Sequence, residues 1–269
     1  MNMKHSTDRA WYENYFGQDY LLIDSHENTA LEVEFLYEIL KLGRGTRLLD
    51  VGCGYGRHMI PLIRRGVNVT GSDISHFMLQ ETIKNIKHKE NDANDKNGYL
   101  KKWLNNGPGL VRCDNRALPF YHTFDCACNM FNSFGYFKEE RDNYRMLTSI
   151  ADTLKPGGLF FIDLVNRDFV IRFNSRKDWS ERNGVFILEN KGFDPVLNRS
   201  EIDVTIVDKN GKREYHHSIR LYSYTELEIL LEAAGFVVRA VFGGFSNESF
   251  DLDHDRMLIL AQTLETEDE

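Results

Sequence analysis

Short apolar segments alternate with segments of helical spacing along the chain, and this alternation constrains the fold more than any other feature. Residues 47–51, 67–73, 124–137 and 159–165 are apolar runs typical of buried strands, and segments of helical spacing lie before and between them. Strands that alternate with helices in this way build a parallel sheet with helices on both faces. We therefore predict a doubly wound α/β fold with a mostly parallel sheet.

Three segments are predicted to contain helices. Residues 29–42 place Leu31, Phe35, Ile39 and Leu42 on one helical face, which we expect to be buried. A second helix is expected over residues 56–65, although it contains Pro61. Residues 85–109 are polar and charged, and we expect them to extend a helix and then form a surface loop.

The sequence pattern changes after residue 177. Runs of β-forming residues follow, joined by Asp194-Pro195 and by Asn210-Gly211, and the second pair is a strong hairpin signal. We predict an antiparallel β insertion that forms a lid over the site. The predicted parts are an N-terminal cap and core at residues 1–177, the lid at 178–222, a return to the core sheet at 223–264, and an acidic tail at 265–269.

Composition disfavours several classes of protein. The chain of 269 residues is 42% hydrophobic, which is ample for a packed core, and its formal net charge of -8 disfavours a nucleic acid partner. No apolar run approaches the ~18 residues of a membrane span, and the first residues lack the apolar region of a secretory signal. The four cysteines form no metal-binding pair. We expect a cytoplasmic protein with buried thiols, no metal site and no membrane partner.

Polar residues stand at or near the ends of four predicted strands. These residues are Asp50, Asp73, Asp114 and Asn129. In a doubly wound sheet, ligands bind beyond the carboxyl ends of the strands. Four polar groups brought to one edge predict a binding site there, more strongly than any of them does alone.

Three glycines follow the first of these residues, in the stretch LLDVGCGYGRH. Gly52, Gly54 and Gly56 either form a plain turn or leave the backbone bare for a ligand. A dinucleotide-binding turn would place its third glycine at position 57, where this chain has Arg57. A carboxylate at Asp73 can accept both ribose hydroxyls of an adenosine, and Asp114 can accept from an exocyclic amine. Together these positions predict a cradle for an adenosine with a short polar tail.

The stretches LLDVGCGYGRH, VTGSDIS, CDNRALPF, FDCACNMFNSFGYF and LKPGGLFFIDLVNRD resemble, in order, the motifs of class I S-adenosylmethionine-dependent methyltransferases. The insertion and the segment RLYSYTELEILLEAAGF resemble the bacterial small-molecule branch, which includes sugar-amine and glycine N-methyltransferases. The resemblance covers about residues 36 to 264. It implies a Rossmann-like fold, S-adenosyl-L-methionine as cofactor and a small-molecule methyl acceptor.

The resemblance also implies the cofactor-binding residues. Asp73 corresponds to the ribose-binding acid, Asp114 to the acceptor of the adenine amine, and Phe131 to the strand end that meets the sulfonium. The segment WYENYFGQDYL resembles a cofactor-covering segment, from which Tyr20 closes over the carboxylate. The full implied set is Tyr20, Asp50, Gly52, Cys53, Gly54, Gly56, Asp73, Ile74, Cys113, Asp114, Asn115, Asn129, Met130 and Phe131.

Residues near the end of the insertion are candidates for contact with the acceptor. Alternation along the strand puts His216, Arg220 and Tyr222 on one polar face, and at most one of the adjacent His216 and His217 is expected to face the pocket. If this face covers the site, Arg220 and Tyr222 contact the acceptor and His216 is a candidate base; if it faces solvent, they have no catalytic role. A neutral amine acceptor needs no protein base, whereas a hydroxyl acceptor needs one.

Other functions stay open at this point. A non-catalytic S-adenosylmethionine-binding protein would carry the same motifs, and so would a methyltransferase that acts on RNA or protein. An NAD-dependent oxidoreductase is disfavoured by the position of the third glycine. The sequence does not identify the acceptor, the methylated atom (N, O or C) or the oligomeric state, for which a dimer is one hypothesis.

Overall fold

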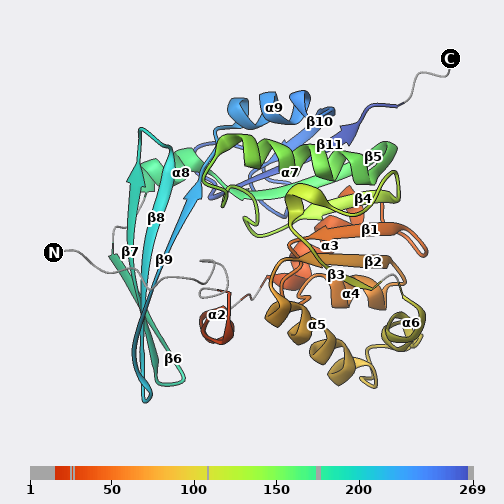
Figure 1. Cartoon of the computed structure of the whole chain (residues 1–269), viewed down its shortest axis with the longest axis horizontal. Coiled ribbons are helices and arrows are strands. Elements are labelled where there is room, and N and C mark those ends of the chain that lie inside the picture. Colours follow the sequence, from red (N-terminus) through yellow and green to blue (C-terminus); the bar gives the residue numbers. More distant parts are fainter. Residues whose placement is uncertain (1–15, 25, 27, 108, 174–176, 266–269) are drawn as a thin grey trace.

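The larger of two sheets forms the centre of the molecule (Figure 1). The computed structural model describes residues 16–24, 26, 28–107, 109–173 and 177–265. In this part of the chain the larger sheet has seven strands, in the spatial order β10 (Phe236–Phe242), β11 (Arg256–Thr263), β5 (Leu154–Val165), β4 (Phe124–Asn129), β1 (Arg47–Val51), β2 (Asn68–Asp73) and β3 (Leu110–Arg112). Strands β1 to β5 pair in parallel, whereas β11 and β10 pair antiparallel.

Adjacent residues of β1 face two separate hydrophobic cores. Leu48 packs into one core and Leu49 into the other, as alternation along a strand requires. The first core is covered by α3 (Thr29–Ile39), α4 (Met59–Arg64), α5 (His76–Lys89) and α6 (Tyr99–Asn106), and the second by α7 (Glu140–Thr153) and α9 (Tyr224–Ala233). The predicted doubly wound, mostly parallel arrangement is therefore confirmed.

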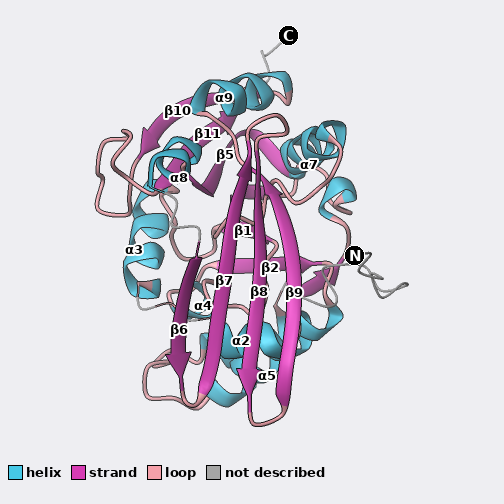
Figure 2. Ribbon diagram, turned by 90° about the vertical axis from the view of Figure 1, so that its left-hand side faces the viewer, coloured by secondary structure: helices cyan, strands magenta, loops and turns pink. Residues whose placement is uncertain are grey.

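A second sheet of four antiparallel strands stands beside the carboxyl edge of the first (Figures 1 and 2). Its strands, in spatial order, are β6 (Lys177–Arg182), β7 (Val185–Asp194), β8 (Arg199–Asp208) and β9 (Gly211–Arg220). Helix α8 (Arg167–Phe173) precedes it, and both views place α2 (Gln18–Ile23) between the two sheets. The predicted antiparallel insertion is thus present, with both predicted turns between its strands.

The polar segment after α5 is not the simple surface loop that we expected. It contains a separate helix, α6, whose Trp103 is buried and donates from Nε1 to the carbonyl of Val69 at 2.8 Å. Leu100 is also fully buried, so this short apolar face anchors α6 beneath β2. This helix was hard to predict because only a few apolar side chains at helical spacing lie among many charged residues.

Other element boundaries also differ from the sequence prediction. Of the predicted helical face, Phe35 and Leu42 are buried and Ile39 packs against the core, whereas Leu31 is exposed. Val33 and Leu36 complete the buried face of α3. Helix α4 begins at Met59, which places Pro61 in the first turn, where no intrahelical N–H bond is lost. Strand β4 ends at Asn129, and the apolar residues after it form a loop.

Three of the four cysteines, Cys53, Cys126 and Cys128, are buried, and all four are free thiols. No helix in the described part of the chain is long and apolar enough to cross a membrane. Among the same residues, no group of three His, Cys, Asp or Glu side chains could hold a metal ion.

Candidate functional site

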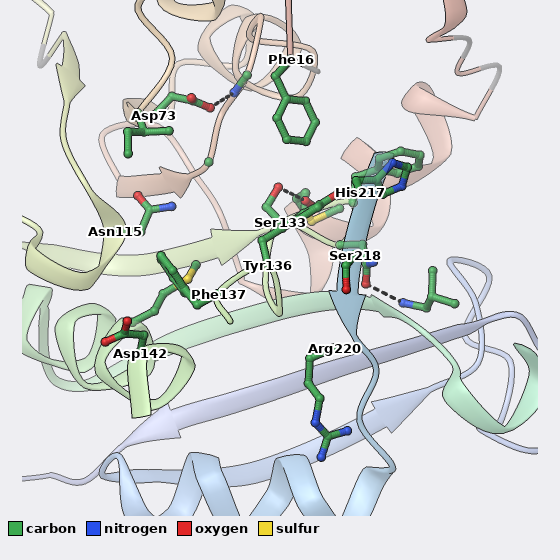
Figure 3. A pocket seen from close by; sticks show the side chains of 18 of the residues that line it. Phe16, Asp73, Asn115, Ser133, Tyr136, Phe137, Asp142, His217, Ser218 and Arg220 are labelled. Carbon is green, nitrogen blue, oxygen red and sulfur yellow. Dashed lines mark hydrogen bonds between the residues drawn. The ribbon is translucent and has the colours of Figure 1, made fainter. Parts of the chain in front are cut away.

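A cavity of about 1660 Å³ lies between the carboxyl edge of the larger sheet and the antiparallel sheet. One end is lined by the loop after β1, which we call the glycine loop (residues 52–56), and the other by β9 and the chain before β8. Pockets for a single small ligand typically enclose ~300–1,000 Å³. The cavity therefore has room for two small molecules side by side. Figure 3 shows Asp73 and Asn115 on one side of it and His217 and Ser218 on the other.

The glycine loop needs its glycines for different reasons. Gly54 has φ +55, and a Cβ built on it would have no heavy atom within 4 Å, so its α-carbon faces the open cavity. Gly56 has φ +81, and a Cβ there would lie 2.7 Å from Cγ2 of Thr82 in α5. Gly54 therefore keeps the backbone bare toward the cavity, whereas Gly56 allows α5 to pack closely against the loop.

Asp73, at the end of β2, is hydrogen-bonded to the glycine loop. Its Oδ2 accepts from the backbone N–H of Gly54 at 2.9 Å, and its Oδ1 accepts from that of Ser75 at 2.8 Å. Burial raises the pKa of Asp73 above its ordinary value. Each carboxylate oxygen keeps a second acceptor position, so Asp73 can hold the loop and a ligand hydroxyl together.

Asp50 lies deeper under the same loop and lines the cavity. Its side chain is buried, which raises its pKa to about 6, and the thiol of Cys128 lies 3.7 Å from its Oδ1. Nearby, His58 and Arg57 share the carboxylate of Glu32 on α3. The loop is thus held by charged groups from the core rather than left as a flexible turn.

Asp114 follows β3 and is paired with Arg116, which sequence analysis did not single out. Arg116 donates to Asp114 from Nη2 at 2.6 Å and to Asp142 from Nη1 at 2.8 Å. The hydrogen bond from Arg116 lowers the pKa of Asp114. Asn115 accepts from the hydroxyl of Ser72 at 3.3 Å. Asp114 is therefore ionised and can act as an acceptor while Arg116 sets its orientation.

The structure places most of the implied cofactor residues around the cavity and leaves three outside its lining. Asn129 is fully buried and donates from Nδ2 to the carbonyl of Val51 at 2.8 Å. Cys113 packs against the core under α7 and α9. Gly56 faces α5, as described above. The residues that line the cavity are Tyr20, Asp50, Gly52, Cys53, Gly54, Asp73, Ile74, Asp114, Asn115, Met130 and Phe131.

Helix α2 connects the two ends of the cavity. Asp19 accepts from Nε of Arg213 in β9 at 2.5 Å, and the hydroxyl of Tyr215 donates to the same carboxylate. Asp24, just after the helix, accepts from the hydroxyl of Tyr55 in the glycine loop at 2.5 Å. Tyr20 lines the cavity between these ties. Residues 1–15, which hold the rest of the predicted N-terminal cap, lie outside the described residues.

Both histidines of β9 are among the residues that line the cavity, whereas alternation along the strand predicted that at most one of them would face it. Strand β9 is at the edge of its sheet, and side chains from both faces of an edge strand can border a cavity beside it. His216 has 53% of its side chain exposed and contacts Asp203 and Glu201. His217 is buried, which lowers its pKa to about 4 and keeps its imidazole neutral at pH 7.

Arg220 and Tyr222 have different surroundings. Arg220 lines the cavity and donates from Nη2 to Glu226 in α9 at 2.7 Å. Tyr222 is 2% exposed, packs against Phe134 at 5.3 Å between ring centroids, and is not among the lining residues. The alternation that placed both on one face ends at Arg220, because β9 ends there and the chain turns into α9.

The loop after β4 also forms a wall of the cavity end next to β9, a role that the sequence pattern did not reveal. Arg199 donates to the carbonyls of Phe137 at 3.1 Å and Ser218 at 2.9 Å. Gly135 accepts from the N–H of Arg220 at 2.9 Å, and a Cβ on Gly135 would lie 2.5 Å from the Arg220 carbonyl oxygen. Ser133 and Tyr136 of the same loop line the cavity (Figure 3). The only local signal for this role was the glycine in NSFGY.

Comparisons with known proteins agree with this geometry. A family model described as a methyltransferase domain matches residues 24–241. Rat (Rattus norvegicus) glycine N-methyltransferase is 30% identical over 167 residues, which cover 61% of this chain and 53% of that protein. The chain thus spans about half the length of the glycine N-methyltransferases that it matches.

Two solved structures share the fold over nearly the whole chain. The CcbJ methyltransferase from Streptomyces caelestis superposes with a TM-score of 0.79 at 17% identity, covering 96% of this chain and 100% of that chain. The amino pentose methyltransferase CalS10 from Micromonospora echinaspora, in a structure with bound S-adenosylmethionine, has a TM-score of 0.62 at 19% identity, covering 97% of this chain and 100% of that chain.

Proposed function

Because this chain belongs to the methyltransferase domain family, we propose that it transfers the methyl group of S-adenosylmethionine to a small-molecule acceptor. The observation that carries this proposal is the single cavity that runs from the glycine loop and Asp73 to the inner side of β9. One end fits an adenosine. The other end is bordered by the four-stranded antiparallel sheet, which is an addition to the parallel fold.

The residues of the glycine-loop end fit the donor. The α-carbon of Gly54 faces open space, so nothing on the loop obstructs a ligand that lies against the backbone. Asp73 keeps acceptor positions for ribose hydroxyls, and Asp114 and Asn115 offer acceptors for an adenine amine. Tyr20 lines the cavity and orients the polar tail of the donor. When bound, S-adenosylmethionine supplies a methyl group that its sulfonium has already activated.

The chain's own contribution is to position the acceptor and to exclude water. An in-line displacement depends mainly on the alignment of the two reacting atoms, which the walls of the cavity impose. Burial keeps the imidazole of His217 neutral but lowers its pKa to about 4, which makes it a weak base, and a neutral amine acceptor needs no protein base. Arg220 and His216 contact the acceptor from β9, and Tyr222 supports this wall from the core.

The acceptor is an amine larger than an amino acid. A relative that matches this chain is named as a glycine N-methyltransferase and a structural neighbour as an amino pentose methyltransferase, so amine acceptors are common to both names. The cavity of about 1660 Å³ leaves more space beside the donor than glycine would fill. An aminosugar or a compound of similar size matches this space.

The test is an assay of S-adenosylhomocysteine release over a panel of glycine, sarcosine, aminosugars and peptides with free amino termini. We expect release with acceptors of aminosugar size, none with glycine, and none from a Gly54→Val variant. Calorimetry with S-adenosylmethionine and NAD accompanies the panel. Binding of NAD alone would indicate an oxidoreductase, and donor binding without release on any acceptor would indicate a non-catalytic binding protein.

A further inference from the structure

The loop after β4 begins with two residues in an unfavourable backbone conformation. Phe131 has φ +54 and Asn132 has φ +60, and neither is glycine. Asparagine tolerates the left-handed region, but for a bulky residue such as phenylalanine a positive φ is an outlier. Strained residues of this kind persist only where their surroundings hold them, and they cluster at functional sites.

The group that holds this turn is Asp163, near the end of β5. Its Oδ2 accepts from the N–H of Phe131 at 2.8 Å, and its backbone carbonyl accepts from the N–H of Asn132 at 2.9 Å. The side chain of Asn132 in turn accepts from the N–H of Val165 at 3.1 Å. Three hydrogen bonds to one stretch of β5 therefore impose the left-handed turn.

Asp163 is itself buried and paired. It is 1% exposed, and Arg256 on the neighbouring strand β11 donates to its Oδ1 from Nε at 2.8 Å and also from Nη2. A buried carboxylate needs such a partner, because an isolated charge in the core is strongly unfavourable. Arg256 thus pairs with one oxygen of Asp163 and leaves the other oxygen directed toward the N–H of Phe131.

Two arginines and a histidine surround the ring of Phe131 at the cavity wall. The guanidinium of Arg256 lies 5.5 Å from its centroid, that of Arg57 lies 5.2 Å away, and the ring of His26 contacts it edge-on at 4.2 Å. All four residues line the cavity. The ring is therefore held in one place, although 41% of Phe131 is exposed.

The turn also sets the position of the glycine loop. Ser133, which follows Asn132, approaches Gly52 so closely that a Cβ on Gly52 would lie 3.0 Å from Cβ of Ser133. A shift of the Phe131–Asn132 turn would thus change the gap between the end of β4 and the loop. In the proposed function, this gap is where the methyl-bearing sulfur of the donor lies.

We propose that Asp163, held by Arg256, is a positioning residue for methyl transfer: it imposes the Phe131–Asn132 turn and thereby shapes the wall that contacts the methyl-bearing side of the donor. The proposal rests on the proposed function for the place of the donor. It assigns a functional role to a carboxylate that contacts neither the donor nor the acceptor.

The test compares Asp163→Asn with Asp125→Asn as a matched control. Asp125, at the opposite end of β4, also accepts from a backbone N–H, that of Arg47 at 2.9 Å, and also pairs with a cation, Lys155. It does not line the cavity. Both changes keep the side-chain volume and replace a hydrogen-bonded carboxylate by an amide, although Asp125 has 37% of its side chain exposed and Asp163 only 1%.

Calorimetry measures the affinity of each full-length variant for S-adenosylmethionine and S-adenosylhomocysteine, which differ by the methyl group. Asp163→Asn is expected to weaken S-adenosylmethionine binding by about tenfold or more and S-adenosylhomocysteine binding at least about threefold less than that. Amide exchange over residues 130–133 is expected to speed up by about tenfold in the same variant. Asp125→Asn is expected to stay within about twofold of the parent protein in all three measurements.

Two results would overturn the proposal. One is an Asp163→Asn protein whose affinities for both ligands stay within about twofold of the parent, whatever its amide exchange. The other is equal weakening of both ligands, which would mean a general structural role. If Asp163→Asn does not fold, Arg256→Lys, which keeps the charge but loses the two-point contact, must show the same preferential loss of S-adenosylmethionine. No acceptor enters these measurements, so failure of the proposed transfer reaction would be seen separately, as donor binding without turnover in the parent protein.

Discussion

The two ends of the cavity are built in different ways. At the glycine-loop end, each functional group follows a strand directly: Gly54 comes just after β1 and Asp73 ends β2. At the end formed by β9, contacts join residues far apart in the chain, as when Arg199 donates to the carbonyls of Phe137 and Ser218. The comparison teaches that the glycine loop and Asp73 depend on local backbone geometry, whereas the end formed by β9, the proposed acceptor end, depends on how two sheets dock.

Gly54→Val should give the largest effect and should act on the donor end alone. Valine at φ +55 is strained, and its side chain would occupy the surface on which the donor lies, so we expect binding of S-adenosylmethionine to fall by about 100-fold or more. Gly98→Val is the matched control, because Gly98 has φ +62 with open space around it and lies at the start of α6, away from the cavity. Calorimetry should find donor binding unchanged in the control, and equal losses in both variants would contradict the comparison.

Asp50 at one end of the cavity and His217 at the other should make the stability of the fold depend on pH in opposite directions. Burial raises the pKa of Asp50 to about 6, so between about pH 4 and 6 the folded state holds a proton that the unfolded chain has lost, and stability falls as pH rises. Burial lowers the pKa of His217 to about 4, so between about pH 6.5 and 4 the unfolded chain gains a proton first, and stability falls as pH falls.

Asp50→Asn and His217→Asn separate these two contributions. In the parent protein, each group should make the free energy of unfolding vary with pH by about 2–3 kcal/mol. Asp50→Asn should remove the decrease seen as pH rises. His217→Asn should remove the decrease seen as pH falls. Urea denaturation of the parent and both variants at about pH 4, 5.5 and 7 measures this. The same sign of change in both variants would refute the opposite responses.

Gly135→Ala should affect the acceptor end and spare the donor end. The added Cβ would lie 2.5 Å from the Arg220 carbonyl oxygen, so β9 must move away from the loop after β4. We expect the acceptor KM to rise by about tenfold while donor affinity stays within about threefold. Equal effects on donor and acceptor would show that the two ends are not independent.

Arg220→Ala and Tyr222→Phe should give the smallest effects and should differ from each other. Arg220 lines the cavity, so its loss should raise the acceptor KM by about threefold to fivefold. Tyr222 is buried beside Phe134, so removal of its hydroxyl should change the acceptor KM by less than about twofold. A larger effect of Tyr222→Phe on the acceptor KM would indicate that Tyr222 contacts the acceptor.

By itself, the sequence determined the doubly wound sheet, the antiparallel insertion and the methyltransferase family, and all three are confirmed. It also brought Asp50, Gly54 and Asp73 to one edge of the sheet. These features could be predicted because each depends on residues close together in the chain: an apolar run makes a strand, and whatever follows that strand lies at its carboxyl end.

Only the tertiary structure decided the rest. It placed Tyr222 in the core, brought both histidines of β9 to the cavity, and joined Asp163 and Arg256, which are 93 residues apart, around the turn at Phe131. No local pattern carries this information, because the contacts depend on where an edge strand ends, how two sheets dock and which distant strands become neighbours. The glycine loop and Asp73 thus follow directly from single strands, whereas the wall at Phe131 and the end formed by β9 exist only once separate parts of the chain have packed together.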